Sequence, residues 1–298
     1  MRNLQRICVG TNFSPEADLA LGTAVALARA TQARIDLVHV VHRPPLYERM
    51  VQSEQKLIGE LERKAATHLQ QIANSPAFVG VTIATHTRVG SPFAELLALS
   101  RVHGHDLIVV GARRRGGLSE MLLGSTAERV LRKAATPVLL AKAAMADPPR
   151  CIVAPTDFSD ASRPAIEEAI ALARRWQARL VLLHVIEPIV QAYAWASDLA
   201  GGEIYVIEPE ELQPEWDALL KTLDLTDVRW ESRTIKGDVA TTVAAIASEL
   251  PADLVVVGTH GRTGLAHALL GSVAEGVARA VDRSVLAVRT GSEPFAIP

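Results

Sequence analysis

A glycine-rich segment in the second half of the chain has the composition of an anion-binding loop. GTHGRTG begins at Gly258, directly after an apolar run, and a Gly-Ser pair follows at Gly271 and Ser272. Glycine lets the backbone approach an anion closely, and a helix beginning after Gly271 exposes N–H groups that lack intrahelical partners. Phosphate is the ligand that such a loop predicts. Arg262 either supplies charge to phosphate oxygens or lies solvated in the loop, and both interpretations stay open.

A carboxylate precedes this loop by about a hundred residues, in the segment PTDFSD that contains Asp157. At the end of a strand, an aspartate can accept hydrogen bonds from ribose hydroxyls or can cap the helix that follows. Ser159 is a second candidate for that helix cap. The residues alone leave both roles of Asp157 open.

Alternating apolar runs and helical patterns must position these groups. Apolar residues recur at helical spacing from Ala165 to Ala173, after the turn that holds Asp157. Strands that alternate with helices predict right-handed crossovers and a parallel sheet, which binds ligands at the carboxyl ends of its strands. The predicted strands are Ile152–Ala154, Leu180–Val185, Val228–Ile235, Leu254–Val257 and Val285–Val288.

The whole pattern occurs twice. RICVGTNFSPEADLAL near the start is echoed by RCIVAPTDFSDASRPAI, and HDLIVVG is echoed by ADLVVVG. We therefore predict two α/β domains, at residues 1–145 and 150–292, joined by the linker MADPPR. Between the second and third strands, the first copy predicts one long helix over 47–73 and the second a shorter helix over 216–223. The aromatic residues of 193–205 form a lid or a contact surface, or they simply pack onto the sheet, which is the favoured interpretation.

The first copy departs from the second at the anion loop. Arg114 stands where the second copy has Gly261, and Asn12 stands where it has Asp157. A side chain at a position of close backbone approach usually blocks a ligand, which favours a decayed site. The alternative is a modified anion site with more positive charge.

Composition limits the classes of function. The 298 residues are 49% hydrophobic with a formal net charge of -2, so no overall basic field attracts nucleic acid or an anionic membrane. No apolar run reaches the roughly 20 residues of a membrane span, and we expect a soluble, cytoplasmic protein. Cys8 and Cys151 are expected to be buried in strands. His103 and His105 suggest only a turn, and no metal site is expected.

The spacing G-x2-G-x9-G-S resembles the ATP loop of the universal stress protein family. The resemblance extends to the Asp157 turn, the LLHV run and the KGD segment, and it covers nearly the whole chain twice. It implies two tandem Rossmann-like domains with five parallel strands each, in the flavodoxin-like order 3-2-1-4-5. It also implies that ATP, with or without Mg²⁺, contacts the second copy through the nucleoside at Asp157 and through adenine at the backbone of Val185. The implied phosphate and ribose contacts are Gly258, Gly261, Gly271 and Ser272, and Arg262 and Val273 are further candidate contacts beside them.

The same resemblance implies that the last strands of the two copies, at 138–141 and 285–288, pair within one chain, and that the chain can also form a homodimer. Residues for hydrolysis form no dedicated set, so we expect binding with at most slow ATPase activity. The predicted function is nucleotide-dependent regulation in the stress response. An ATP-independent interaction scaffold is the alternative.

Overall fold

The computed structural model describes residues 4–42, 52–112, 123–144, 149–187, 207–259 and 271–289. Strands and helices alternate in both copies, as the sequence predicts. The first copy contains β1 (Arg6–Thr11), α1 (Pro15–Thr31), β2 (Arg34–His42), α2 (Gln52–Ala73), β3 (Ile83–Gly90), α3 (Pro92–His103), β4 (Leu107–Gly111), α4 (Ser125–Lys133) and β5 (Val138–Ala141). The second contains β6 (Cys151–Pro155), α5 (Arg163–Trp176), β7 (Arg179–Ile186), α7 (Gln213–Leu220), β8 (Arg229–Lys236), α8 (Val239–Glu249), β9 (Leu254–Gly258), α9 (Ser272–Ala280) and β10 (Ser284–Val288).

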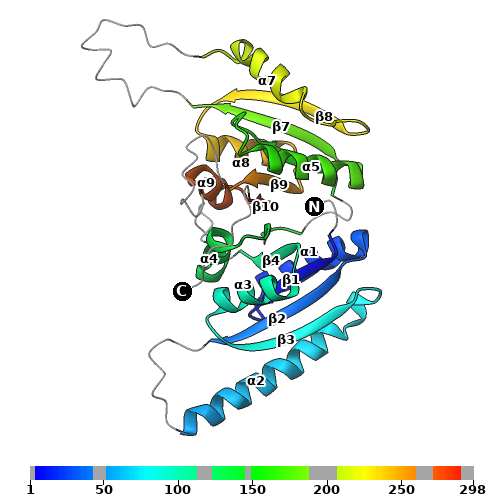
Figure 1. Cartoon of the computed structure of the whole chain (residues 1–298), viewed down its shortest axis with the longest axis vertical. Helices are drawn as coiled ribbons and strands as arrows, with labels where there is room; N and C mark the ends of the chain where they lie inside the picture. The colour runs from blue at the N-terminus through cyan, green and yellow to red at the C-terminus, as the bar shows by residue number, and fades with distance from the viewer. Residues whose placement is uncertain are drawn as a thin grey trace, which may run out of the picture.

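All these strands belong to one sheet that runs through the molecule from β3 to β8 (Figure 1). Its order is β3-β2-β1-β4-β5-β10-β9-β6-β7-β8. Each half therefore has the order 3-2-1-4-5 with parallel neighbours, which confirms the predicted fold class. The carboxyl ends of β1 and β4, and of β6 and β9, lie where the strand order reverses, which is where such sheets bind ligands.

The two halves meet at an antiparallel pair, β5 with β10. Val285 lies opposite Leu140 and Ala287 opposite Val138, so the predicted pairing of the last strands within one chain is confirmed. This pairing joins the edge strand of one domain to the edge strand of the other. A homodimer would therefore have to use a different surface, because both of these edges are already paired.

Two basic residues at equivalent positions form hydrogen bonds across this junction. Lys142, which follows β5, is buried and donates from Nζ to the carbonyls of Ala278 (2.5 Å) and Val281 (2.6 Å) at the end of α9. Arg289, which follows β10, donates to the carbonyl of Ala134 (2.6 Å) at the end of α4. Each domain thus supplies a cation to the carboxyl end of a helix in the other, where the helix dipole favours positive charge.

Hydrophobic cores cover both faces of the sheet, because successive strand residues point to opposite faces. Ile7 and Val9 of β1 face one core, and Cys8 between them faces the other. Helices α1, α2, α5 and α7 cover the first face, and α3, α4, α8 and α9 cover the second. Both cysteines are buried in or at strands, as predicted.

The helices between the second and third strands differ between the copies. In the first copy, α2 confirms the long helix. In the second, α7 begins at Gln213, three residues before the predicted start, because Pro214 lies in its first turn, where proline is tolerated. The linker residues 145–148 and the aromatic segment 193–205 lie outside the described residues.

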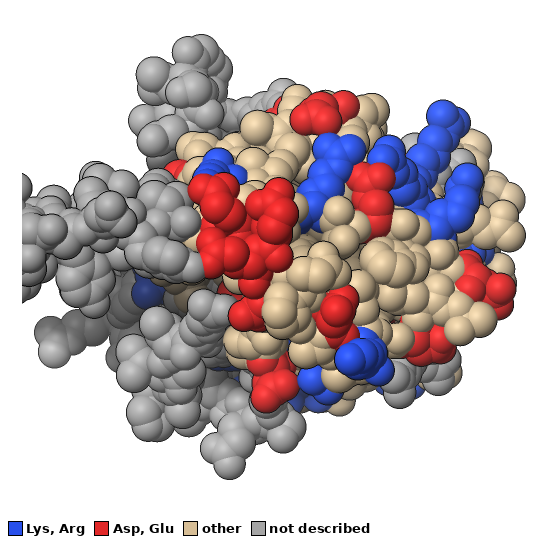
Figure 2. Space-filling view, turned by 90° about the horizontal axis from the view of Figure 1, so that it is seen from above, with Lys and Arg blue, Asp and Glu red and all other residues tan. Residues whose placement is uncertain are grey.

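The outer edge of the second domain is charged. Arg179, Glu231, Arg233 and Glu249 form a chain of ion pairs there, with N···O distances of 2.6 to 3.0 Å. Figure 2 shows both signs of charge on the face seen from the β8 end. Charge on an edge strand discourages pairing with another sheet. Among the described helices, none combines the length and the apolar character that a membrane span requires.

Candidate functional site: a cavity at the strand ends of the second domain

A cavity of about 490 Å³ opens at the carboxyl ends of β6, β7 and β9. Its volume falls within the range of about 300–1,000 Å³ that small-molecule sites occupy. The lining residues are Pro155, Thr156, Asp157, Ser162, Leu183, His184, Val185, Ile186, Glu187, Ile207, Val239, Val257, Gly258, Thr259, Gly271, Ser272, Val273 and Ala274.

The turn after β6 is held by its own side chains. Oδ1 of Asp157 accepts hydrogen bonds from N (3.0 Å) and Oγ (2.5 Å) of Ser159, and Oγ1 of Thr156 accepts from N of Phe158 (3.0 Å). Phe158 has a φ of 63°, in the left-handed region that costs a non-glycine residue about 1–2 kcal/mol. Backbone in such a conformation persists where the surroundings determine it, and it is common at functional sites.

The prediction that Ser159 caps the next helix is wrong. Helix α5 begins at Arg163, after Ser162, with Pro164 in its first turn. In the first copy, Pro15 directly follows Ser14, and Ser14 does cap α1. The position of the proline therefore decides where each helix starts, because proline is tolerated in the first turn of a helix but not in its interior.

His184 shapes the wall beside this turn. The carbonyl of Thr156 can only accept, so Nδ1 of His184 donates to it over 2.8 Å. If the parallel β6–β7 ladder continued one step beyond the Thr156–Leu183 bond, the N–H of Val185 would donate to that same carbonyl. The imidazole donates to this acceptor instead, and both His184 and Val185 line the cavity. Phe158 stacks on His184 with ring centroids 4.3 Å apart and so fixes the ring.

The cavity has an apolar side and a polar end. Ile186, Val239 and Val257 contribute to the apolar side. At the polar end, Gly271 is the N-cap of α9, and a glycine has no side chain with which to cap the first turn of that helix. The N–H groups of that turn are the kind that bind phosphate or carboxylate.

Six of the predicted contacts therefore line one cavity, namely Asp157, Val185, Gly258, Gly271, Ser272 and Val273. Gly261 and Arg262 lie outside the described residues. Val239 and Thr259 also line the cavity, and neither was among the predicted contacts. The KGD segment was a signal for Val239, because Asp238 caps α8 and Val239 is the first residue of that helix.

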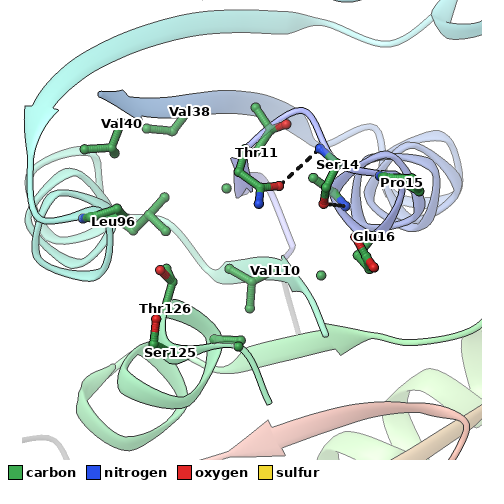
Figure 3. Close-up of a pocket in the computed structure, with 17 residues that line it drawn as sticks. Thr11, Ser14, Pro15, Glu16, Val38, Val40, Leu96, Val110, Ser125 and Thr126 are labelled. Carbon is green, nitrogen blue, oxygen red and sulfur yellow. Dashed lines mark hydrogen bonds between the residues drawn. The ribbon is translucent and has the colours of Figure 1, made fainter. Parts of the chain in front are cut away.

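The first domain has an equivalent cavity of about 570 Å³ (Figure 3). Thr11, Val40, Gly111 and Ser125 line it at positions that match Thr156, Val185, Gly258 and Ser272. Its residues are Gly10, Thr11, Asn12, Ser14, Pro15, Glu16, Ala17, Val38, Val40, Pro92, Leu96, Val110, Gly111, Gly124, Ser125, Thr126 and Ala127. The first copy has therefore kept the hollow at its strand ends.

The chemistry of this first cavity differs from that of the second. Asn12 keeps the turn, since its Oδ1 accepts from N of Ser14 (3.2 Å), but it carries no charge. Glu16 adds a carboxylate to the lining, and its carbonyl lies where a Cβ on Gly111 would clash. His39 donates to the carbonyl of Thr11 (2.9 Å), and burial lowers the pKa of His39. Arg114, the residue predicted to block or recharge the phosphate position, lies outside the described residues.

Comparison with known proteins identifies the family. The model of the universal stress protein family matches residues 3–142 and 149–289. A universal stress protein of Mycolicibacterium smegmatis is 31% identical over 300 residues, covering 95% of this chain and 96% of that protein. One from Methanocaldococcus jannaschii is 34% identical over 140 residues, which cover 46% of this chain and 81% of that protein. A universal stress protein from Archaeoglobus fulgidus has the same fold, with a TM-score of 0.75 at 19% identity over 96% of this chain and 98% of that one. The chain belongs to the universal stress protein family, with two family domains in tandem.

Proposed function

We propose that the second domain binds ATP and that the protein regulates a stress response according to whether this nucleotide is bound. The observation that carries the proposal is the convergence of three features on one cavity: the carboxylate of Asp157, an apolar wall and the first turn of α9, whose N-cap is a glycine. These features match the three chemical parts of ATP, which are a sugar, an aromatic base and a chain of phosphates.

Each part of the nucleotide has a counterpart in this arrangement. Adenine packs on the apolar side near Val239 and bonds to the backbone of Val185. Asp157 accepts from the ribose hydroxyls while still holding its turn, because a carboxylate has about four lone-pair sites. The phosphates, with or without Mg²⁺, lie at Gly258 and at the amino end of α9, where the N–H groups of Ser272 and Val273 favour negative charge. Gly261 and Arg262 complete this phosphate contact in the proposal.

The first domain acts as a partner of the second in this proposal. Asn12 and Glu16 make its cavity less suited to a nucleotide, because one removes the ribose carboxylate and the other adds negative charge near the phosphates. The shared sheet gives the second domain a route to influence the first. We also propose a cytoplasmic location, where ATP is available and both buried thiols stay reduced.

Isothermal titration calorimetry with ATP on the purified chain tests the proposal, together with a matched pair of variants. Asp157→Asn keeps the turn, as Asn12 does in the first copy, and removes the charge. We expect it to weaken ATP binding about 10-fold, the equivalent of one charge-assisted hydrogen bond of about 1.5 kcal/mol. Asn12→Asp changes the matching residue of the first domain, so the affinity of the second domain for ATP should stay at the wild-type value.

The alternative function is a scaffold that acts without nucleotide. If the wild-type chain gives no heat with ATP and releases no nucleotide on denaturation, the scaffold is the better account. If ATP binds but Asp157→Asn has no effect, the nucleotide contacts a different part of the protein from the one proposed.

A further inference from the structure

Three histidines of the first domain surround one buried carboxylate. This cluster and the cavity of the same domain lie toward opposite ends of the strands. Asp36 lies near the start of β2 and its side chain is fully buried. His86 comes from β3, His103 is the last residue of α3, and His105 lies just before β4. The cluster is therefore at the amino-terminal end of the strands, whereas the cavity is at their carboxyl ends.

The donor atoms converge closely on the two oxygens of Asp36. Oδ2 lies 2.8 Å from Nε2 of His105 and 3.1 Å from Nδ1 of His103, and Oδ1 lies 3.3 Å from Nε2 of His86. One ligand atom from each of Asp36, His103 and His105 lies within 4.8 Å of the others. In a tetrahedral zinc site with bonds of about 2.0–2.1 Å, neighbouring ligand atoms are about 3.4 Å apart. The three observed N···O spacings, 2.8 to 3.3 Å, lie just below that value, so the side chains would separate slightly around an ion.

The contact of His86 with this carboxylate is incomplete. Its Nε2 atom is buried and has no hydrogen-bond partner within the described ranges, because the 3.3 Å contact with Oδ1 lacks hydrogen-bond geometry. A buried polar atom without a partner is costly, and a metal ion would satisfy it. The side chains of His86 and His103 are 21% and 26% exposed, which leaves a path for an ion from solvent.

The second domain provides an internal comparison, because it has the same fold without the cluster. Val181 occupies the position of Asp36, Leu250 that of His103 and Ala252 that of His105. Arg233, which replaces His86, pairs with Glu231 and Glu249 instead. The fold therefore does not require a carboxylate and three imidazoles here, and a structural role alone does not explain why the first domain concentrates them.

We propose that Asp36, His86, His103 and His105 form a binding site for a divalent transition-metal ion of the zinc type. Three imidazoles and one carboxylate are a nitrogen- and oxygen-donor set that Zn²⁺ and Co²⁺ accept, and the harder ion Mg²⁺ prefers all-oxygen ligands. The carboxyl end of α3 adds negative potential beside the site. Arg34 is the one cation in contact with Asp36 among the described residues, at 3.2 Å from Oδ1, and its side chain is 44% exposed, so it can swing into solvent when the ion binds.

Titration of the tag-free, chelator-treated full chain with ZnCl₂ by calorimetry tests the site, and Co²⁺ in place of Zn²⁺ adds a visible absorption band that reports coordination geometry. We expect one ion per chain, a tetrahedral cobalt spectrum and no binding of Mg²⁺. His105→Ala and His103→Leu copy the residues of the second domain, so the fold should tolerate them. Loss of a residue that only supports a metal ligand weakens binding by roughly 10–100-fold. Each of these variants removes a ligand itself, so each should weaken Zn²⁺ binding by at least that much.

His68→Ala is the matched control, because His68 is exposed on α2 outside the cluster. It should bind Zn²⁺ as the wild type does. Absence of Zn²⁺ binding by the wild-type chain would overturn the proposal. So would equal affinity in the wild type, His105→Ala and His103→Leu, because the ion would then be held elsewhere. Thermal unfolding in chelator shows whether each variant is folded before it is titrated.

Discussion

Replacing Lys142 by methionine tests whether the two domains are joined by the charged contacts at the ends of their helices. Methionine keeps most of the side-chain volume but removes the ammonium group. The carbonyls of Ala278 and Val281 would lose a donor that now lies 2.5 and 2.6 Å away. The end of α9 would also lose its cation.

The magnitude follows from these contacts. A buried carbonyl left without a partner costs about 1–3 kcal/mol, and a cation at a partly buried helix end contributes up to about 2 kcal/mol. Relief from burying an ammonium group offsets part of this loss, since that desolvation costs several kcal/mol. We therefore expect Lys142→Met to lower the free energy of unfolding by about 2–4 kcal/mol.

Urea unfolding followed by circular dichroism measures this difference. Lys64→Met is the control, because Lys64 is exposed on α2 and its loss should change stability by no more than about 0.5 kcal/mol. Arg289→Met removes the reciprocal contact with Ala134 and should also destabilise the chain. If Lys142→Met is no more destabilising than Lys64→Met, the reasoning about the domain junction is refuted.

Three further predictions concern single positions. Gln177 is the C-cap of α5 and has a φ of 53°, in the left-handed region that glycine adopts more easily. Gln177→Gly should therefore raise the free energy of unfolding by about 0.5–1 kcal/mol in urea melts, and a decrease in that free energy would contradict the left-handed cap. Burial raises the pKa of the thiols of Cys8 and Cys151, so iodoacetamide should modify them only after unfolding; rapid modification of the native chain, read by mass spectrometry, would disagree. Burial lowers the pKa of His39 in the folded chain below its usual value of about 6.5. As the pH falls below about 6.5, the unfolded chain therefore binds a proton more readily than the folded chain, and the free energy of unfolding should decrease. His39→Gln should flatten this slope in thermal melts from pH 7 to pH 5, and an unchanged slope would assign it to other groups.

The sequence predicts the fold well because the same information appears in it twice. Each strand run could be checked against its copy, and β9 differs from the predicted Leu254–Val257 by only one residue. Helix starts were harder, because a proline can end one helix or begin another. Pro164 and Pro214 both lie in first turns, and this moved the start of α5 away from Ser159 and that of α7 ahead of Trp216.

The candidate nucleotide cavity was partly predictable for a different reason. Loop glycines and a turn carboxylate are local signals, and Asp157, Gly258 and Gly271 do line one cavity. The role of His184 was not predictable, since it depends on a ladder that stops at one particular step. In the first domain, Arg114 and Asn12 favoured a blocked site over a recharged anion site, and the described residues there line an equivalent cavity.

Clusters of residues that are far apart in the chain could not be predicted from the sequence. Asp36 and His105 are far apart in the chain, and only the fold, in which α3 packs against β2 and β1 lies between β2 and β4, brings their side chains to 2.8 Å. The prediction of a turn at His103 is wrong, because His103 is the last residue of α3 and the turn follows it at Gly104. Lys142 and Arg289 could be aligned as equivalents, but their contacts with the opposite domain depend on the antiparallel junction.

Calorimetric titration with ATP, using a matched pair of cavity-filling variants, tests the central claim most directly. Val239 and Pro92 occupy equivalent positions in the linings of the second and first cavities. We predict one ATP bound per wild-type chain, loss of binding in Val239→Trp and unchanged binding in Pro92→Trp. Loss of binding in Pro92→Trp with retention in Val239→Trp would place the nucleotide in the first domain and contradict this account.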